Sequence, residues 1–98
     1  MKIENNNNQE VDILQLVKTG NLRAISDLDS NQLNIRDESE STVIHYAARS
    51  DNTELLKFFI VTKSMSGSME NSIGATPAHD AAALGHLSVI EWLVDHTD

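Results

Sequence analysis

The apolar positions of this chain recur at helical spacing, in short segments that follow one another in pairs. The residues that mark the first pair are Val11, Leu14 and Val17, followed by Leu22, Ile25 and Leu28. A second pair starts at Thr42 and ends in the apolar run Leu55–Val61, and a third covers about residues 76–94. Helices this short are marginal in isolation, so each pair must bury its apolar side against a neighbouring pair. The pattern therefore predicts an all-α fold built by stacking helix pairs.

The stretch from Gly74 to His86 carries the signals for one complete short helix. Thr76 can cap its start, because a threonine hydroxyl accepts a hydrogen bond from an unpaired first-turn N–H. Pro77 follows at the first helical position, where its missing N–H costs nothing. Gly85 supplies the left-handed residue that commonly ends a helix. These signals predict a helix that starts at Pro77 and ends before Gly85.

The same stretch resembles an ankyrin repeat. Residues 76–81 read T-P-A-H-D-A, close to the ankyrin signature T-P-L-H-x-A, and residues 85–94 resemble the second helix of that family. Thr42 begins a related segment 34 residues before Thr76, near the family period of about 33. The resemblance implies an ankyrin-repeat solenoid of about three helix-turn-helix repeats, the first divergent and the third terminal. The expected segments are a flexible Asn-rich tail over 1–9 and an ankyrin-repeat domain over 10–98, with repeats at about 10–36, 37–70 and 71–98.

The segments between the helices depart from the family pattern in three places. Residues 32–42 resemble the connecting finger of ankyrin repeats, but Glu40 replaces the turn glycine, which predicts a strained or differently built turn. Residues 62–73 lack the finger sequence and predict a looser, Ser-rich loop. Asp51-Asn52 replaces Gly-His between the helices of the second pair. Asparagine is, after glycine, the residue best suited to a left-handed helix end, so we expect that end to be kept.

The histidines raise the question of catalysis or metal binding. His45 and His79 occupy the same position in two repeats, and the resemblance implies that each ring is structural, bonded to backbone and to a threonine hydroxyl between neighbouring repeats. The alternative is an HD-type metal-dependent phosphohydrolase, because His45, the pair His79-Asp80 and Asp95 follow an H…HD…D order. The two hypotheses differ in whether His45 and His79 lie in corresponding helices or converge. We expect corresponding helices, with no catalytic residue, no bound metal and no cofactor.

The charge balance narrows the class of partner. Fifteen acidic residues against seven basic ones give a formal net charge of −8, which makes nucleic acid and anionic membranes poor partners. A protein with a basic or amphipathic surface is favoured instead. The absence of cysteine excludes a disulfide scaffold. No apolar run follows Met1 and Lys2, and none is long enough to span a membrane, so we expect a cytoplasmic protein.

The ankyrin resemblance implies a non-catalytic protein-binding module. In that family, partners contact the variable positions of the finger tips and the exposed side of the first helices. Here these positions are Glu38, Ser39, Ser41, Arg49, Ser50, Ser72, Ile73, Ala75, Asp80, Ala83 and Leu84. Ile73 and Leu84 are apolar at positions that should face water, and grouped apolar residues on a surface favour a contact site.

The C-terminal end of the stack suggests a second kind of association. No polar capping repeat follows the third pair, so Val89, Trp92 and Leu93 are expected to leave apolar surface exposed. This predicts either the front of a longer array, with no partner of its own, or a chain that associates end to end.

A narrower resemblance points to the cytoskeleton. The run P-A-H-D-A-A within residues 74–83, with Trp92 in the next helix, resembles the repeats of espin and its insect relative Forked. In those actin-bundling proteins the ankyrin array binds myosin tails. The resemblance therefore implies a cytoskeleton-linked partner.

Overall fold

The computed structural model describes residues 12–97, and the tail predicted over 1–9 lies outside this range. The described chain is helical, as the spacing predicts. Its α-helices are α1 (Ile13–Thr19), α2 (Leu22–Ser26), α3 (Ser30–Leu33), α4 (Val43–Arg49), α5 (Thr53–Lys57), α6 (Pro77–Leu84) and α7 (Leu87–His96), and the π-helical turn η3 (Phe58–Thr62) continues α5. Extended pairing within 12–97 is limited to one isolated bridge, between Arg36 and Thr42.

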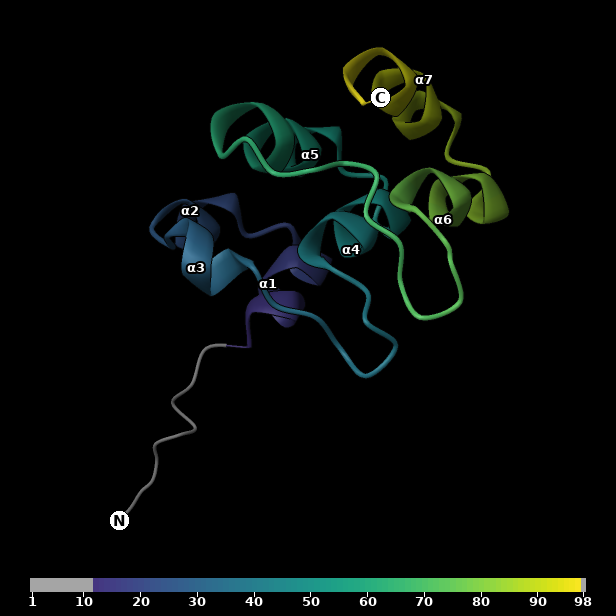
Figure 1. Cartoon of the computed structure of the whole chain (residues 1–98). Helices are drawn as coiled ribbons and strands as arrows, with labels where there is room; N and C mark the ends of the chain where they lie inside the picture. The colour runs from purple at the N-terminus through teal and green to yellow at the C-terminus, as the bar shows by residue number, and fades with distance from the viewer. Residues whose placement is uncertain (1–11, 98) are drawn as a thin grey trace.

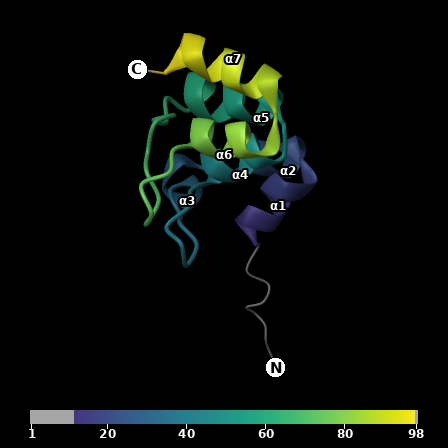
Figure 2. The same cartoon turned by 90° about the vertical axis from the view of Figure 1, so that its right-hand side faces the viewer.

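The helix pairs stack in two layers (Figures 1 and 2). In one layer α4 packs against α1 on one side and α6 on the other, and in the other layer α5 packs against α7. The loops that precede α4 and α6 extend from the same side of the stack. The apolar periodicity and the repeat spacing therefore predict the architecture correctly.

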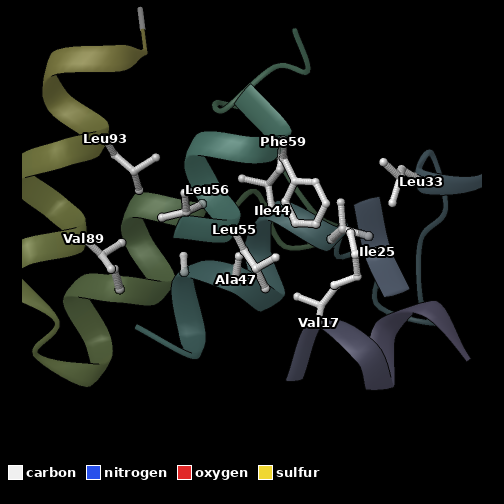
Figure 3. Close-up of a cluster of buried hydrophobic side chains, with 13 residues drawn as sticks. Val17, Ile25, Leu33, Ile44, Ala47, Leu55, Leu56, Phe59, Val89 and Leu93 are labelled. Atoms are coloured by element: carbon white, nitrogen blue, oxygen red, sulfur yellow. The ribbon is translucent and has the colours of Figure 1, made fainter. Parts of the chain in front are cut away.

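Buried aliphatic side chains and one aromatic ring fill the space between the layers (Figure 3). Phe59 is fully buried, and its ring lies between Ile44 and Ile25. On the other side of the core, Val89 and Leu93 project from α7 into the same cluster. Because burying a side chain of this size contributes about 1.5–3 kcal/mol, this core is the main source of the fold's stability.

A left-handed residue ends the first helix of each pair. These residues are Gly20, Asp51 and Gly85, with φ angles of 72°, 56° and 75°. In the second pair the left-handed residue is Asp51 and not Asn52, whose φ is −111°. Asn52 instead caps α5, because its side-chain oxygen accepts a hydrogen bond from the Leu55 N–H at 3.0 Å. Asp51 thus provides the left-handed end of α4, and Asn52 caps the start of α5.

The apolar spacing does not predict α3, which forms where the sequence suggests the start of a finger. The Asp29 carboxylate accepts a hydrogen bond from the Gln32 N–H at 2.8 Å, and the Gln32 side chain accepts one from the Asp29 N–H at 3.0 Å. This reciprocal capping box stabilises even a single turn. Leu33 ends the turn and is fully buried. The finger therefore begins after Leu33.

The strain expected in the first finger is present at Glu40. This residue has a φ of 63°, a left-handed conformation that costs an ordinary side chain roughly 1–2 kcal/mol. Its N–H donates a hydrogen bond to the Asp37 carbonyl oxygen at 2.9 Å, which closes the turn. At the same place in the second finger, 34 residues later, Gly74 has a φ of 81°. Glycine adopts this conformation without steric cost.

We expect Glu40→Gly to raise the free energy of unfolding by about 0.5–1 kcal/mol, because it removes this strain. The change also removes an exposed ion pair with Arg36, at an N–O distance of 3.7 Å, which contributes little. The matched change Gly74→Glu should lower the stability, because it introduces the same strain into the second finger. Urea unfolding of both variants measures the effect. A midpoint for Glu40→Gly at or below that of the parent would contradict this account.

Candidate protein-binding surface

The first finger tip, residues 37–41, is a turn fixed by one carboxylate. Asp37 Oδ1 accepts hydrogen bonds from the N–H groups of Ser39 and Ser41, each at 2.9 Å. The Asp37 N–H donates to the Ser41 carbonyl oxygen at 3.0 Å. An aspartate that pairs with the backbone two residues ahead is a common turn-forming element. The backbone of this tip is therefore held in one conformation.

The second finger tip, residues 71–75, repeats this turn with asparagine in place of aspartate. Asn71 Oδ1 accepts hydrogen bonds from the N–H groups of Ile73 at 3.1 Å and Ala75 at 3.0 Å. The expectation of a loose loop over 62–73 is therefore wrong for its last residues. The amide oxygen of Asn71 provides the same acceptor as the Asp37 carboxylate.

Hydrogen bonds also join the two finger tips. The Ser72 N–H donates to the Ser39 carbonyl oxygen at 2.9 Å. The Arg36 guanidinium donates to the carbonyl oxygens of Glu40 and Glu70, each at 3.1 Å, and so spans both fingers. The tips lie side by side as one ordered edge (Figures 1 and 2).

The positions predicted to contact a partner differ in exposure. Those with exposed side chains are Glu38, Ser39, Ser50, Ser72, Ile73, Ala83 and Leu84. Ile73 is 85% exposed and Leu84 is 55% exposed. Ile73 lies in the second finger tip, and Leu84 lies at the end of α6. Arg49, Ala75 and Asp80 are half-buried. The positions open to a partner are therefore the exposed ones, at the two finger tips and at the ends of α4 and α6.

The prediction of Ser41 as a contact position is wrong, because the residue is fully buried. Its hydroxyl accepts hydrogen bonds from the Arg49 guanidinium at 2.7 Å and from the Asn71 side-chain amide at 3.3 Å. Arg49 in turn pairs with Asp80 through an Nε–Oδ2 hydrogen bond of 2.8 Å. These four charged and polar side chains connect α4, α6 and the fingers, and the charges of Arg49 and Asp80 largely neutralise each other.

Tyr46 lies on α4, at the base of the first finger. Its hydroxyl donates a hydrogen bond to Asp37 Oδ2 at 2.5 Å. Lys18 Nζ lies 5.4 Å and the Arg49 guanidinium 5.1 Å from the ring centroid, within cation–π range. The Tyr46 hydrogen bond lowers the pKa of Asp37 below its ordinary value of 3.8. The same bond raises the pKa of Tyr46 above 10.0.

We expect the stability difference between the parent and Tyr46→Phe to depend on pH. The lowered pKa of Asp37 means that its contribution is present above the unfolded pKa of 3.8 and is lost as the pH falls through the lower folded value. The raised pKa of Tyr46 means that its contribution is present below 10.0 and is lost as the pH rises through the higher folded value. The difference should therefore be largest between roughly pH 5 and 9 and shrink on both sides. Urea unfolding across this range measures it, and a pH-independent difference would contradict the assignment.

His45 bridges the second and third repeats, as the family resemblance implies. The Thr42 N–H donates to His45 Nδ1 at 3.1 Å, so the proton of the neutral ring lies on Nε2. His45 Nε2 then donates to the Ala75 carbonyl oxygen, 2.8 Å away. The ring is fully buried. It joins the start of α4 to the second finger tip.

His79 departs from the expected role, because it is exposed and, among the described residues, its ring bonds only within its own repeat. Its Nδ1 accepts a hydrogen bond from the Thr76 N–H at 3.0 Å and lies 2.8 Å from the Thr76 hydroxyl. A different histidine makes an inter-repeat bond here, since His86 Nε2 lies 3.0 Å from the Arg49 carbonyl oxygen at the end of α4. The third repeat packs over His45, whereas none of the described residues packs over His79 in the same way.

The positions of the histidines speak against the phosphohydrolase hypothesis. His45 and His79 occupy the third position of α4 and of α6, each bonded to the threonine that caps its own helix. They lie in corresponding helices and do not converge. Residues 12–97 contain no group of three or more His, Asp or Glu side chains placed to hold a metal ion. None of the helices in this part of the chain has the length and apolar character that a membrane span requires.

Comparison with known proteins gives relatives of low identity. The chain is 28% identical over 97 residues to the 26S proteasome non-ATPase regulatory subunit 10 of Dictyostelium discoideum, covering 96% of this chain and 42% of that protein. It is 26% identical over 85 residues to the putative palmitoyltransferase ZDHHC13 of Danio rerio, covering 85% of this chain and 13% of that protein. The chain thus spans less than half the length of either relative.

A solved structure and a family model agree on the fold. One chain of the complex between a predatory endopeptidase from Bdellovibrio bacteriovorus and an immunity protein has a TM-score of 0.73 and 24% identity, over 87% of this chain and 46% of that one. At this identity the likeness concerns the fold alone. The family model described as ankyrin repeats (3 copies) matches residues 3–98. The chain therefore belongs to the ankyrin-repeat family, as its T-P-A-H-D-A motif and its spacing predict.

Proposed function

We propose that this chain is a non-catalytic binding module whose protein partner contacts the finger tips and the exposed end of α6. Ankyrin repeats are a protein-interaction fold, which makes protein binding the general expectation. The observation that carries the specific assignment is Ile73. Its side chain is 85% exposed, yet its backbone N–H is hydrogen-bonded to Asn71 in an ordered turn. A large, exposed apolar side chain on an ordered backbone favours a binding contact. Because the backbone is already ordered, binding costs little further conformational entropy of the backbone.

The charges support a partner with a basic or amphipathic surface. Glu38 and Glu40 are exposed at the first finger tip, beside the apolar Ile73 on the neighbouring tip. Asp80 contributes less than the sequence suggests, because it is paired with Arg49. The net charge of −8 should speed the encounter with a basic target and make the association rate sensitive to salt.

We also propose that the protein is cytoplasmic and that its partner is a cytoskeletal protein, as for the espin family. The letters that carry the espin resemblance also have structural roles here. Asp80 bonds to Arg49, and the Trp92 ring stacks on His96 with centroids 4.0 Å apart. These letters alone do not favour the espin family over other ankyrin-repeat proteins. Myosin-tail segments should therefore be compared with basic helical proteins on equal terms.

The test is an affinity pull-down with the whole chain, followed by binding measurements with the purified partner. We expect the double variant Ile73→Ser/Leu84→Ser to weaken partner affinity by at least about tenfold, as the loss of central apolar contacts commonly does. The control is Val61→Ser. Val61 is an apolar residue of η3 that is 59% exposed, comparable to Leu84. Thermal unfolding checks that the variants keep the parent's stability. Unchanged affinity for the double variant would place binding on another face.

A further inference from the structure

The first finger tip is held by a side chain of α4 as well as by its own turn. Asp37 uses both carboxylate oxygens, because Oδ1 accepts hydrogen bonds from the N–H groups of Ser39 and Ser41, and Oδ2 accepts one from the Tyr46 hydroxyl. The Tyr46 bond measures 2.5 Å, and a hydrogen bond from a hydroxyl to a carboxylate is stronger than one between neutral groups. While the phenol holds Oδ2, Oδ1 stays directed at the two N–H groups. The conformation of this tip therefore depends on a residue outside it.

The Tyr46 ring is held in turn by residues of three helices. It is half-buried on α4, with Lys18 Nζ of α1 5.4 Å and the Arg49 guanidinium of α4 5.1 Å from the ring centroid. Arg49 is fixed by its 2.8 Å bond to Asp80 of α6. The Tyr46 hydroxyl therefore couples the position of Asp37 to the packed helices α1, α4 and α6.

Within residues 12–97, the second finger tip has no equivalent of the Tyr46 bond. Asn71 takes the place of Asp37, 34 residues later, and Asp80 takes the place of Tyr46. The Asp80 side chain is paired with Arg49, and an ionised carboxylate has no hydrogen to donate. The turn of the second tip therefore relies on support from elsewhere.

Part of this support comes from the first finger, which lies beside the second (Figures 1 and 2). At the tip, the Ser72 N–H donates to the Ser39 carbonyl oxygen at 2.9 Å. Closer to the base, Arg36 of the first finger donates to the Glu70 carbonyl oxygen at 3.1 Å, and His45 of α4 holds the other end of the second finger. The base of the second finger is thus anchored on α4, whereas its tip is anchored on the first finger.

We infer that Tyr46 is a positioning residue for the finger-tip surface, which consists of the two tips and the exposed end of α6. Its hydroxyl fixes Asp37, Asp37 fixes the first tip, and the first tip fixes Ser72, next to the exposed Ile73. Tyr46 thus acts on a partner through the fingers and not by touching it. This role rests on the proposed function for its effect on binding, but the ordering of the tips can be measured in the free chain.

Tyr46→Phe tests this role, because it removes the hydroxyl and keeps the ring with its two cation–π contacts. Amide exchange with water is measured by NMR on the isotope-labelled full chain. We expect exchange at the N–H groups of Ser39, Ser41 and Ser72 to become at least about fivefold faster, since lost hydrogen bonds favour local opening. A hydroxyl that only stabilised the whole fold would change exchange in α6 and α7 by as large a factor. Exchange in those helices should therefore rise by a smaller factor than in the tips.

Asn71→Ala is the matched variant in the second tip. It removes the acceptor of the Ile73 and Ala75 N–H groups, whose exchange should become at least about fivefold faster. The N–H groups of the first tip should keep the parent's exchange rates, because the bond from Tyr46 is intact. Support thus runs from the first tip to the second, and not in reverse.

Several results of the exchange experiment would overturn the role of Tyr46. The first tip of Tyr46→Phe could exchange at the parent's rate, or α6 and α7 could change by the same factor as the tips. Faster exchange in the first tip without any change at Ser72 would mean that the second tip does not depend on the first. A first tip loosened as much by Asn71→Ala as by Tyr46→Phe would equally contradict the direction of support.

Binding distinguishes this role from the proposed function. With the partner recovered by the pull-down, Tyr46→Phe should raise the dissociation constant at least about threefold, because fewer molecules have both tips in the binding conformation. If Ile73→Ser/Leu84→Ser weakens binding and Tyr46→Phe does not, the proposed function stands and the positioning role is overturned. If the tips loosen in Tyr46→Phe while Ile73→Ser/Leu84→Ser keeps its partner, the finger-tip assignment falls, whereas the support of the tips by Tyr46 is upheld.

Discussion

His45→Ala should lower the free energy of unfolding by about 2–4 kcal/mol, since it combines a cavity with lost buried hydrogen bonds. The His45 ring is fully buried. Its removal leaves the Thr42 N–H and the Ala75 carbonyl oxygen without their partner at the joint between two repeats. Equilibrium urea unfolding followed by circular dichroism measures the change.

His79→Ala provides the matched control, because it removes the same residue from the same helix position in the next repeat. His79 is exposed and, within residues 12–97, its side chain bonds only to Thr76, so we expect a loss of less than about 1 kcal/mol. Equal losses for the two variants would mean that the inter-repeat bond of His45 contributes nothing, and would contradict the account of the joint.

Phe59→Ala should lower the free energy of unfolding by about 3–5 kcal/mol, the usual cost of deleting a buried phenylalanine. Phe59 is fully buried in the core between the helix layers (Figure 3). Domains of this size are stable by only about 5–15 kcal/mol, so the variant should be partly unfolded at moderate temperature. Its neighbour Phe58 is half-buried, with the two ring centroids 5.7 Å apart.

Phe58→Ala is the control for that experiment and should cost clearly less, about 1–2 kcal/mol, because less apolar area is buried. Thermal unfolding of both variants gives the comparison. If Phe58→Ala proved the more destabilising change, the assignment of the core between the layers would be wrong.

Local signals predict the helix pairs well because each helix carries its own start and stop. Thr76, Pro77 and Gly85 fix α6 from within about ten residues of sequence, and the structure keeps all three roles. The same holds for the left-handed strain at Glu40, where the repeat pattern requires glycine. Such features depend on the local backbone conformation, so they can be predicted without knowing how the helices pack.

The departures have two different causes. The second finger tip and α3 do carry local signals, the Asn71-x-x-Gly74 turn and the Asp29-x-x-Gln32 capping box, which apolar spacing overlooks. By contrast, η3 forms at Phe58–Thr62 without any comparable signal in the sequence. The π-helical turn has to be observed in the structure.

The candidate site is harder to predict because exposure is set by distant residues. Ser41 is buried by Arg49, eight residues away, and by Asn71, thirty residues away. The charge of Asp80 is neutralised by Arg49 from another repeat. His79 is exposed because nothing in the described chain packs over it, whereas His45 is covered by the next repeat. Repeat position identifies equivalent residues, but their neighbours decide which of them can reach a partner.

The most direct test of the finger-tip surface is amide hydrogen exchange on the full chain, with and without its purified partner. We expect slower exchange in the two finger tips, residues 37–41 and 71–75, and at the end of α6 near Leu84. Exchange in α2 and α5, on the opposite layer, should not change. Protection confined to α2 and α5, with the finger tips unaffected at saturating partner, would contradict the account.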